Sequence, residues 1–220
     1  MGALAGRLGR VKLCASTPVK STGEAATLAA GGLALSIDTR ARRHWDRALT
    51  STPVVLSASG TSTGVAISSS NYAVDYAAGT VTFATARSTA QVYTLDVNYL
   101  TASYLGVTHG WTLDADVNML ENTAFSTTTG ATRWRTFTPG LGGGTVSLNR
   151  FVQESTASPF YDLQNAESDL VLELLPSATA GAYQCYGRVE RVGFDTPVDG
   201  MPEETVDIRV DGPLSFTTNL

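Results

Sequence analysis

The sequence predicts a mainly β protein, an antiparallel β-sandwich or partial barrel with one short flanking α-helix. Many segments alternate apolar and polar residues with a period of two, which is typical of half-buried strands. Gly occurs 21 times among 220 residues, charged residues make up only 16%, and Ser plus Thr outnumber them. This composition favours short strands and turns over helices. Because no strand–helix–strand rhythm is present, we expect antiparallel sheets.

We predict three regions, which could also form one continuous domain. These are an N-terminal arm with the first strands over residues 1–47, a β-hairpin module or insertion over 48–105, and a β-sandwich core over 106–220. A chain of this length can bury a sizeable core on its own.

Charge is unevenly spread along the chain. Residues 1–50 hold eight Lys/Arg and three Asp/Glu, whereas residues 51–220 hold seven and 17. This is either scatter on a solvated surface or a basic front that meets the acidic back of a neighbouring copy. The basic cluster Arg40–Trp45 could mark nucleic-acid contact. Since the cluster is short and the chain has a net charge of −5, we favour a subunit contact or a surface strand.

The hairpin module is the first strong strand pattern. Tyr72, Val74 and Tyr76 alternate with polar or small residues, and the return strand follows at Thr80–Phe83. Between them Ala77-Ala78-Gly79 supplies a turn in which Gly79 can take a positive φ. A further strand is expected where alternating residues run from Val92 to Tyr99.

The strictest alternation lies at Trp111–Met119. Its apolar face holds Trp111, Leu113, Ala115, Val117 and Met119, and we expect this face to pack on a core. Its other face holds Thr112, Asp114, Asp116 and Asn118, and must meet water because two nearby carboxylates are costly to bury.

The remaining elements follow in order after a Thr/Ser loop. We expect a hairpin turn at Pro139–Gly144, a strand at Thr145–Val152, and a short helix over 158–167, with Ser158 as N-cap and Pro159 in the first turn. Four more strands are predicted at Leu170–Leu174, Tyr183–Phe194 with a bulge or bend at Gly187, Thr205–Asp211 and Leu214–Phe216.

Residues that could carry chemistry are few. His44 and His109 have no ligand spacing, so a zinc site is not expected. The Asp114-x-Asp116-x-Asn118 pattern begins like a calcium loop, but it lacks Gly at the sixth position and Glu at the twelfth. Gly142-Gly143-Gly144-Thr145 lacks the lysine of a phosphate-binding loop. We therefore predict neither an enzyme nor a cofactor or metal site.

Cysteine use and hydropathy add two further expectations. Cys14 and Cys185 share no local motif, so a disulfide framework is not expected. No apolar run approaches the roughly 20 residues of a membrane span, and residues 1–13 lack the long apolar segment of a signal peptide. We predict no membrane association.

The order of several motifs resembles the major tail tube proteins of tailed, siphophage-type bacteriophages. The motifs are Y-A-V-D-Y-A-A-G-T-V-T-F at 72–83, W-R-x-F at 134–137, P-G-L at 139–141, the strand Tyr183–Gly187 and D-G-P-L at 211–214. The resemblance implies a virion protein, assembled in the host cytoplasm, that forms stacked hexameric rings. Such rings complete a large β-barrel through which duplex DNA leaves the capsid without specific binding. Implied partners are further copies of the chain, the tape measure protein and the tail terminator protein.

The resemblance also leads us to assign residues to the lumen of the tube and to the contacts between rings. A DNA channel needs more strands than the roughly 16–18 of a porin, so several subunits must contribute to one barrel. We expect Thr112, Asp114, Asp116 and Asn118 to face the lumen, because that face of the strand carries no Lys or Arg. Ring stacking is assigned to basic residues near the N-terminus: Arg7, Arg10, Arg40, Arg42 and Arg43.

Two other functions stay open. One is a type VI secretion-like tube protein, which would obey the same ring physics. The other is a carbohydrate- or receptor-binding β-sandwich of a virion or cell surface. That class usually exposes aromatic residues on one sheet face, whereas Trp45, Trp111 and Trp134 do not cluster in the sequence.

Overall fold

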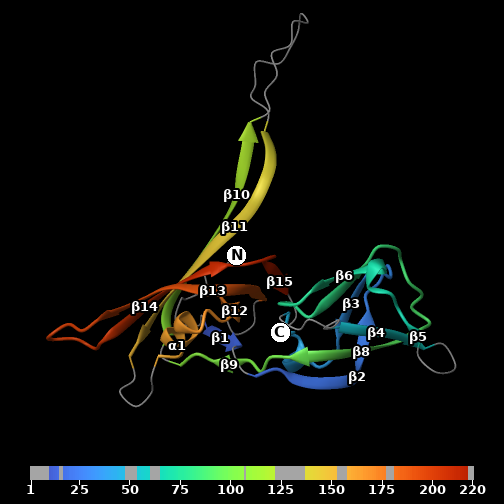
Figure 1. Cartoon of the computed structure of the whole chain (residues 1–220), viewed down its shortest axis with the longest axis horizontal. Coiled ribbons are helices and arrows are strands. Elements are labelled where there is room, and N and C mark those ends of the chain that lie inside the picture. Colours follow the sequence, from blue (N-terminus) through green and yellow to red (C-terminus); the bar gives the residue numbers. More distant parts are fainter. Residues whose placement is uncertain are drawn as a thin grey trace, which may run out of the picture.

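The computed structural model describes residues 10–14, 17–47, 54–59, 65–106, 108–121, 137–152, 158–176 and 181–217. Every strand pair in it is antiparallel, and the strands form two sheets that lie end to end (Figure 1). The expectation of a mainly β fold with one short flanking α-helix is confirmed.

Sheet A has eight strands in the order β10-β11-β14-β13-β12-β1-β9, with β15 paired to β13 outside this path. Their bounds are β1 Arg10–Cys14, β9 Ser103–Tyr104, β10 Thr108–Glu121, β11 Phe137–Phe151, β12 Leu170–Leu175, β13 Ala182–Asp195, β14 Glu203–Val210 and β15 Ser215–Thr217.

Sheet B has seven strands in the order β5-β4-β8-β2-β3-β7-β6. Their bounds are β2 Val19–Leu28, β3 Ala34–Ile37, β4 Val54–Ser59, β5 Val65–Ala66, β6 Tyr72–Asp75, β7 Thr80–Phe83 and β8 Val92–Tyr99. Two 3-10 turns, η2 Arg40–Arg42 and η3 Ser69–Asn71, interrupt this part of the chain. Strands β2 and β3 thus share a sheet with residues 54–99, and the division at residues 47 and 105 stays a prediction.

Strand β13 joins the two halves of sheet A. Its first half pairs with β12 from Tyr183 to Gly187, and its second half pairs with β14 from Gly187 to Asp195. A register irregularity between Val189 and Arg191 marks the bend, slightly beyond the Gly187 position that the sequence suggested. Ile208 lies so close to Gly187 that a Cβ there would meet its Cγ2 at 2.6 Å, so this glycine permits close strand packing rather than the bend itself.

Helix α1 (Pro159–Asn165) covers the core of sheet A. Ser158 precedes it, and its side chain accepts a hydrogen bond from the Tyr161 amide, as expected of an N-cap. Phe160 is fully buried among side chains from β1, β11, β12, β13 and β14. The helix begins where it was predicted and ends earlier, because Glu167 takes a positive φ of 49°.

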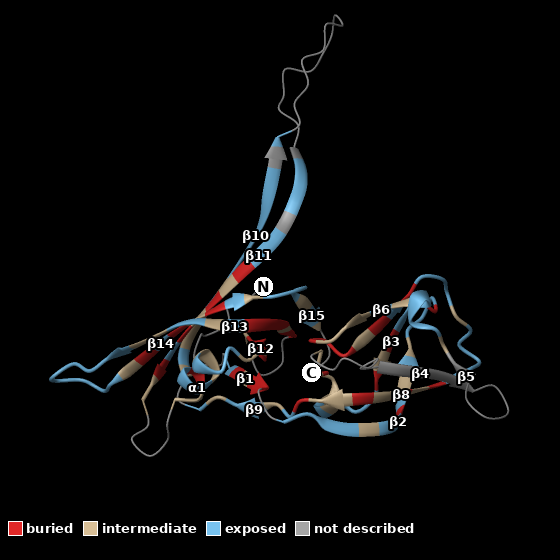
Figure 2. Ribbon diagram, in the orientation of Figure 1, coloured by how far each residue is buried: buried red, intermediate tan, exposed pale blue. Residues whose placement is uncertain are grey.

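Sheet B has its own core, built around Trp45 and the inward residues of β3, β7 and β8. The predicted turn between β6 and β7 is present, with Gly79 at φ 64°. Asp75 accepts hydrogen bonds from the Ala77 and Ala78 amides and fixes that turn. Figure 2 shows buried residues in both sheets. A third buried cluster takes its members from both parts: Cys14, Ala77, Leu100, Val171 and Tyr186.

Two expectations about residues 110–152 are wrong. Pro139–Gly144 is not a turn, because all of it lies within β11, and Pro139 and Gly142–Gly144 pair with β10 on either side of a register irregularity. The apolar face of β10 also does not pack on a core throughout, since Val117 and Met119 are 51% and 58% exposed. Both errors have one cause: the two strands continue beyond the rest of the sheet (Figure 1).

We predict that Phe160→Ala lowers the free energy of unfolding by about 3–5 kcal/mol, because it removes a buried ring and leaves a cavity beneath α1. Urea denaturation followed by circular dichroism measures this change. The matched control is Tyr161→Ala on the same helix, whose side chain is exposed and whose loss should cost less than about 0.5 kcal/mol. Equal effects of the two substitutions would contradict the docking of α1.

Candidate functional site

The β10–β11 pair forms a ribbon that outruns its sheet. Strand β14 supports β11 only from Thr145 to Phe151, and the pairing of β10 with β11 continues to Glu121 and Phe137. The outer part of the ribbon is therefore two-stranded within the described residues (Figure 1). Two-stranded ribbons are marginally stable alone in water, so this part of the molecule is the candidate contact site.

One face of the ribbon is polar, as the sequence predicted. Thr112, Asp114, Asp116 and Asn118 are all exposed. Thr112 lies opposite Ser147 of β11, and Asp114 opposite Thr145. Residues directly opposite in an antiparallel pair point to the same side, so hydroxyls accompany the carboxylates on this face.

The polar face continues across β14 and β13, where the structure adds arginines that the sequence pattern of β10 alone did not reveal. Arg209 lies level with Thr145 and Arg188, and Asp207 lies level with Ser147 and Arg191. Cross-strand hydrogen bonds support this alignment: Ser147 Oγ donates to Asp207 Oδ1 at 2.6 Å, and Arg209 Nη1 donates to Thr145 Oγ1 at 3.4 Å. The face is therefore acidic on β10 and basic on its far side.

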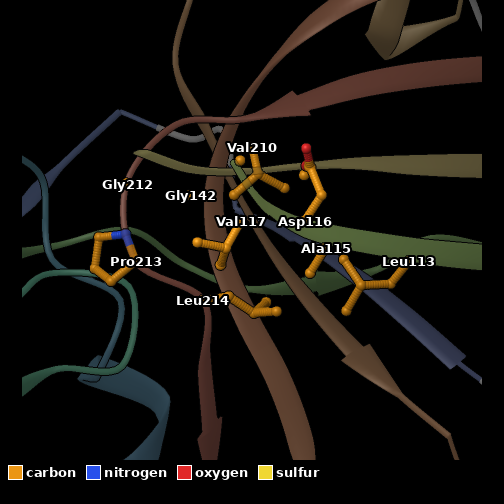
Figure 3. Close-up of a pocket in the computed structure, with 11 residues that line it drawn as sticks. Leu113, Ala115, Asp116, Val117, Gly142, Val210, Gly212, Pro213 and Leu214 are labelled. Atoms are coloured by element: carbon orange, nitrogen blue, oxygen red, sulfur yellow. The ribbon is translucent and has the colours of Figure 1, made fainter. Parts of the chain in front are cut away.

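The opposite face of the ribbon is apolar and partly hollow. Leu113, Ala115 and Val117 of β10 lie opposite Val146, Gly144 and Gly142 of β11. The two glycines carry no side chain, and the space above them forms a groove of about 380 Å³. Its other wall is the chain that leaves β14, with Val210, Pro213 and Leu214 (Figure 3).

Gly144 is needed for the shape of this groove. A Cβ at Gly144 would come within 2.8 Å of the Asp114 carbonyl oxygen and 3.4 Å of Val210 Cγ2. At Gly142 a Cβ would meet its neighbours only at ordinary contact distances of 3.7 and 3.9 Å. Glycine inside a strand often marks a place where another backbone approaches closely.

The arginines that the sequence assigned to ring stacking have different surroundings. Arg7 lies outside the described residues. Arg10 is exposed, with its guanidinium 5.6 Å from the centre of the Tyr104 ring. Arg42 contacts Glu24, and Arg43 Nε donates to the Ile37 carbonyl at 3.1 Å. Arg40 reaches Glu173 in sheet A. The stacking role of these residues stays a prediction.

Glu173 is the centre of a buried ionic cluster at the junction of the two sheets. It is 2% exposed and accepts Lys12 Nζ at 2.8 Å and Arg40 Nη2 at 3.0 Å. His44 Nε2 lies 3.4 Å from the same carboxylate, and His44 Nδ1 lies 2.8 Å from the Ala77 carbonyl oxygen. Both ring nitrogens thus face acceptors, an arrangement that suits a protonated imidazole. Nothing in the sequence spacing indicated that these four residues meet.

The cluster strongly shifts two pKa values. Burial alone would raise the pKa of Glu173, but hydrogen bonds from His44 and Lys12 outweigh burial and lower the pKa to about 2. Burial alone would lower the pKa of His44, but hydrogen bonds with Cys14 and Glu173 outweigh it and raise the pKa to about 10. His44 and Glu173 are therefore charged together over the whole physiological range.

Further contacts hold the junction together. Tyr186 of β13 donates its hydroxyl hydrogen bond to the Trp45 carbonyl, and the Arg47 guanidinium lies 4.4 Å from the centre of the Tyr186 ring. Arg47 also bridges Asp169 and Asp211. Together these contacts connect the segment that follows η2 to strands of sheet A.

Cys14, His44 and Glu173 resemble the set of groups found in cysteine hydrolases, but the site lacks access. Cys14 is fully buried, and His44 and Glu173 are nearly so. A nucleophile must reach its substrate, so this cluster is structural. Among the described residues, no group of three or more His, Cys, Asp or Glu is placed to hold a metal ion, and no helix is long and apolar enough to cross a membrane.

No family model and no curated protein matches the sequence. Among solved structures, the chain is similar to one from the virion of a native gene transfer agent particle, with 13% identity, a TM-score of 0.45, and coverage of 53% of this chain and 89% of that chain. It is also similar to the tail of an empty gene transfer agent particle, with 12% identity, a TM-score of 0.46, and coverage of 54% and 87%. For the SPP1 tail tube the values are 11%, 0.43, 55% and 70%. At these identities the likeness concerns the fold alone.

We predict that Glu173→Gln lowers the free energy of unfolding by about 3–5 kcal/mol, because it leaves the buried His44 without its counter-charge. The pKa of Glu173 is depressed from 4.5 to about 2, so its contribution is present above pH 4.5 and lost as pH falls toward 2. The pKa of His44 is raised from 6.5 to about 10, so its contribution is present below pH 6.5 and lost as pH rises through 10.

The measurement is urea denaturation of both proteins from pH 2 to pH 10. The difference between wild type and Glu173→Gln should be largest between about pH 4.5 and 6.5 and should shrink on either side of that window. The matched control is Glu203→Gln, an incompletely buried carboxylate at the start of β14. A difference that does not vary with pH would contradict the ionic origin of the stabilisation.

Proposed function

We propose that this chain is a major tail tube subunit of a tailed bacteriophage, which assembles into stacked hexameric rings that form the conduit for DNA ejection. The observation that carries the proposal is the ribbon, because the described side chains of its outer half are exposed on both faces. Val117 and Met119 are exposed, and such apolar residues on a two-stranded extension call for burial against other chains.

The ring is proposed to close through the free edges of the four long strands of sheet A. On one side β10 is the edge strand of the sheet. On the other side, β13 beyond Gly187 pairs with β14 alone among the described strands, and Gln164 of α1 donates to the Glu190 carbonyl on this stretch at 3.0 Å. One chain therefore offers two different edges, and pairing them head to tail gives a cyclic, heterologous interface. Closure would also remove edges that otherwise invite aggregation.

The polar face is proposed to line the bore. Thr112, Asp114, Asp116 and Asn118 then meet the passing DNA, together with hydroxyls of β11. Arg188, Arg191 and Arg209 on the same face would attract phosphates. The aspartates of β10 supply the opposing charge, so the wall has no continuous basic stripe. DNA passes such a wall without specific binding.

We also propose partners and a location for this subunit. The tape measure and tail terminator proteins would be the partners at the bore and at the tube end. The protein would be assembled in the host cytoplasm and remain in the virion. A type VI secretion-like tube would form the same rings. Measuring DNA release from virions distinguishes the two functions, because a phage tail tube conducts DNA and a secretion tube does not.

A carbohydrate- or receptor-binding module has less support. Trp45 is fully buried in the core of sheet B, and Trp111 packs at the core of sheet A. Trp134 lies outside the described residues. Neither described tryptophan offers the exposed aromatic platform on which sugars stack.

The purified chain is expected to form rings or rods in negative-stain electron microscopy at micromolar concentration. Analytical ultracentrifugation of the same sample should show a species larger than the 23.1 kDa monomer. A monodisperse monomer at every concentration and salt tested would refute the proposed function.

Two double variants on the same strand test which face does what. Val117→Asp with Met119→Asp should abolish rings and rods, because it places charges on the apolar face that needs burial. Asp114→Lys with Asp116→Lys should leave tubes assembled and slow DNA ejection, because lysines on the bore bind phosphate.

The measurements are microscopy of each purified variant and DNA release from virions that carry it. Circular dichroism of the monomer confirms folding, since all four side chains are exposed in the single chain. Normal DNA ejection by virions with the lysine variant would show that Asp114 and Asp116 do not line the bore. Normal tubes from the aspartate variant would show that the apolar face is not part of the subunit interface.

A further inference from the structure

The ladder between β13 and β14 is interrupted at Glu190. Val189 lies opposite Ile208 of β14 and Arg191 lies opposite Asp207, so Glu190 is one extra residue on β13. An extra residue of this kind disturbs the ladder and bends the strand, and it is common at sheet edges where pairing ends. Strand β13 is therefore divided at Glu190 into two stretches.

Helix α1 covers the edge of β13 at the same point. Gln164 Nε2 donates to the Glu190 carbonyl oxygen at 3.0 Å, and Arg188 Nε donates to Asp169 Oδ1 at 2.6 Å. An amide of an added strand would need the place that the Gln164 amide group occupies. A bulge and a covering helix are two devices by which proteins protect a sheet edge from further pairing, and both meet at Glu190.

The next stretch of β13, Arg191–Asp195, has neither device. Its five residues pair one to one with Asp207–Glu203 of β14 without a further irregularity. No described strand pairs with its other side. An edge that is protected at one point and regular and open beside it is suited to receive another strand through main-chain hydrogen bonds.

Phe194 indicates which face of the added strand is apolar. It lies opposite Glu204, and Val192 lies opposite Val206. Glu204 and Val206 are fully buried, so Phe194 and Val192 point to the core side of the sheet. Phe194 is nevertheless 55% exposed. A strand that adds here with apolar residues on the core side would cover this ring.

Strand length identifies the partner. The edge strands β9, β15, β5 and β6 span only two, three, two and four residues, so none of them matches the five open residues of β13. Strand β10 is the other edge of sheet A, and its ladder is regular from Gly110 to Val117. On its core side Trp111 and Leu113 are partly buried against the core.

Strand direction agrees with this choice. Three successive antiparallel pairings separate β10 from β13, so the two strands of one copy run in opposite directions. Copies that share one orientation in a ring would therefore join β13 to the next β10 as an antiparallel pair. Polar residues then stay on one face of the joined sheet and apolar residues on the other.

We propose that the Gln164–Glu190 contact is a stop, which confines strand addition to Arg191–Asp195 of β13, and that β10 of a second copy pairs there with its apolar residues on the side of Phe194. The inference rests on the proposed tube function and adds the point at which the ring-closing ladder ends. The alternation of side chains alone permits a slip by an even number of residues. A fixed end of the ladder lets every copy join in the same register.

The test is residue-resolved amide hydrogen exchange of wild-type rings. The reference is the chain with Val117→Asp and Met119→Asp, which is expected to stay unassembled. In rings, the amides of Val192–Asp195 that face away from β14 should exchange at least about tenfold more slowly, as should those of Gly110–Ala115 that face away from β11. Exchange at Arg188–Glu190 should change less than about twofold.

A variant without the stop supplies the second arm. In Gln164→Ala the protected stretch should extend into Arg188–Glu190, and the fraction of closed rings in micrographs should fall, because copies join in more than one register. The matched control is Asn165→Ala, at the next and exposed position of α1, which should change neither result. A loss of stability alone would not move the boundary of protection, so this boundary distinguishes a stop from a merely structural contact.

A synthetic peptide of residues 108–121 supplies an arm that needs no rings. Added to the chain with Val117→Asp and Met119→Asp, it should slow exchange at Val192–Asp195 and leave Arg188–Glu190 unchanged. A peptide of the same composition in scrambled order is the control and should protect neither stretch.

Each outcome separates this inference from the proposed function. Rings in which protection of β13 reaches Arg188–Glu190, or in which Gln164→Ala does not move its boundary, would overturn the stop and leave the tube function standing. Protection of β13 without β10 would mean that two β13 edges pair with each other, and would also overturn the inference. Peptide protection confined to Val192–Asp195 in a chain that never forms rings would support the inference and refute the tube function. Absence of both rings and peptide protection would refute both.

Discussion

The structure depends on a mismatch of strand lengths. Strands β10 and β11 span 14 and 15 residues, but β14 supports β11 over only seven of them, Thr145–Phe151. Burial of an apolar face against a core is what stabilises a sheet. Among the described residues of the two strands, the fully buried side chains of Val146 and Leu148 lie at the base of the ribbon. The described side chains of the outer part are exposed on both faces, and in the proposed function a second copy of the chain covers them.

A second constraint is the way the two sheets are held together. The contacts at their junction are both polar and apolar. Lys12, Arg40 and His44 converge on the buried Glu173 carboxylate, and a buried apolar cluster joins residues of both parts: Cys14, Ala77, Leu100, Val171 and Tyr186. The charged groups are costly to remove from water unless every partner is present. Loss of one partner would leave a buried charge unpaired, so the ionic cluster favours the arrangement of the sheets in which all four groups meet. Three of its four members come from residues 10–44. The basic N-terminal part of the chain, which the sequence suggested to be a surface, therefore places some of its charged side chains in contacts inside the molecule.

The charge pattern of the polar face has a related explanation. Along β10 the sequence shows only carboxylates, hydroxyls and amides, yet strand pairing aligns this row with Arg188, Arg191 and Arg209. A face that carries both signs attracts neither a polyanion nor its counterions strongly. The acidic character of β10 is thus better understood as a balance for the arginines beside it than as a repulsive wall.

The sequence by itself determined the local elements. Period-two alternation located β6–β8, β10 and β12–β14, and the Ser158-Pro159 pair located the start of α1, because strand periodicity and helix capping depend on residues a few positions apart. Glycine chemistry was ambiguous: Gly79 does turn the chain, but Gly142–Gly144 were assigned to a turn and instead lie in a strand. The same absence of a side chain permits a positive φ or the close approach of another backbone, and only the surrounding structure distinguishes them.

Tertiary structure alone decided the site. Glu173 lies 161 residues from Lys12 and 133 from Arg40, and no short-range pattern reports such a meeting. The groove between the ribbon and Pro213-Leu214, the arginines level with Asp114, and the exposure of Val117 likewise depend on which strands become neighbours. The period-two pattern of apolar and polar residues indicated which side chains share a face of a strand. Pairing between strands far apart in the sequence determined which residues cover that face.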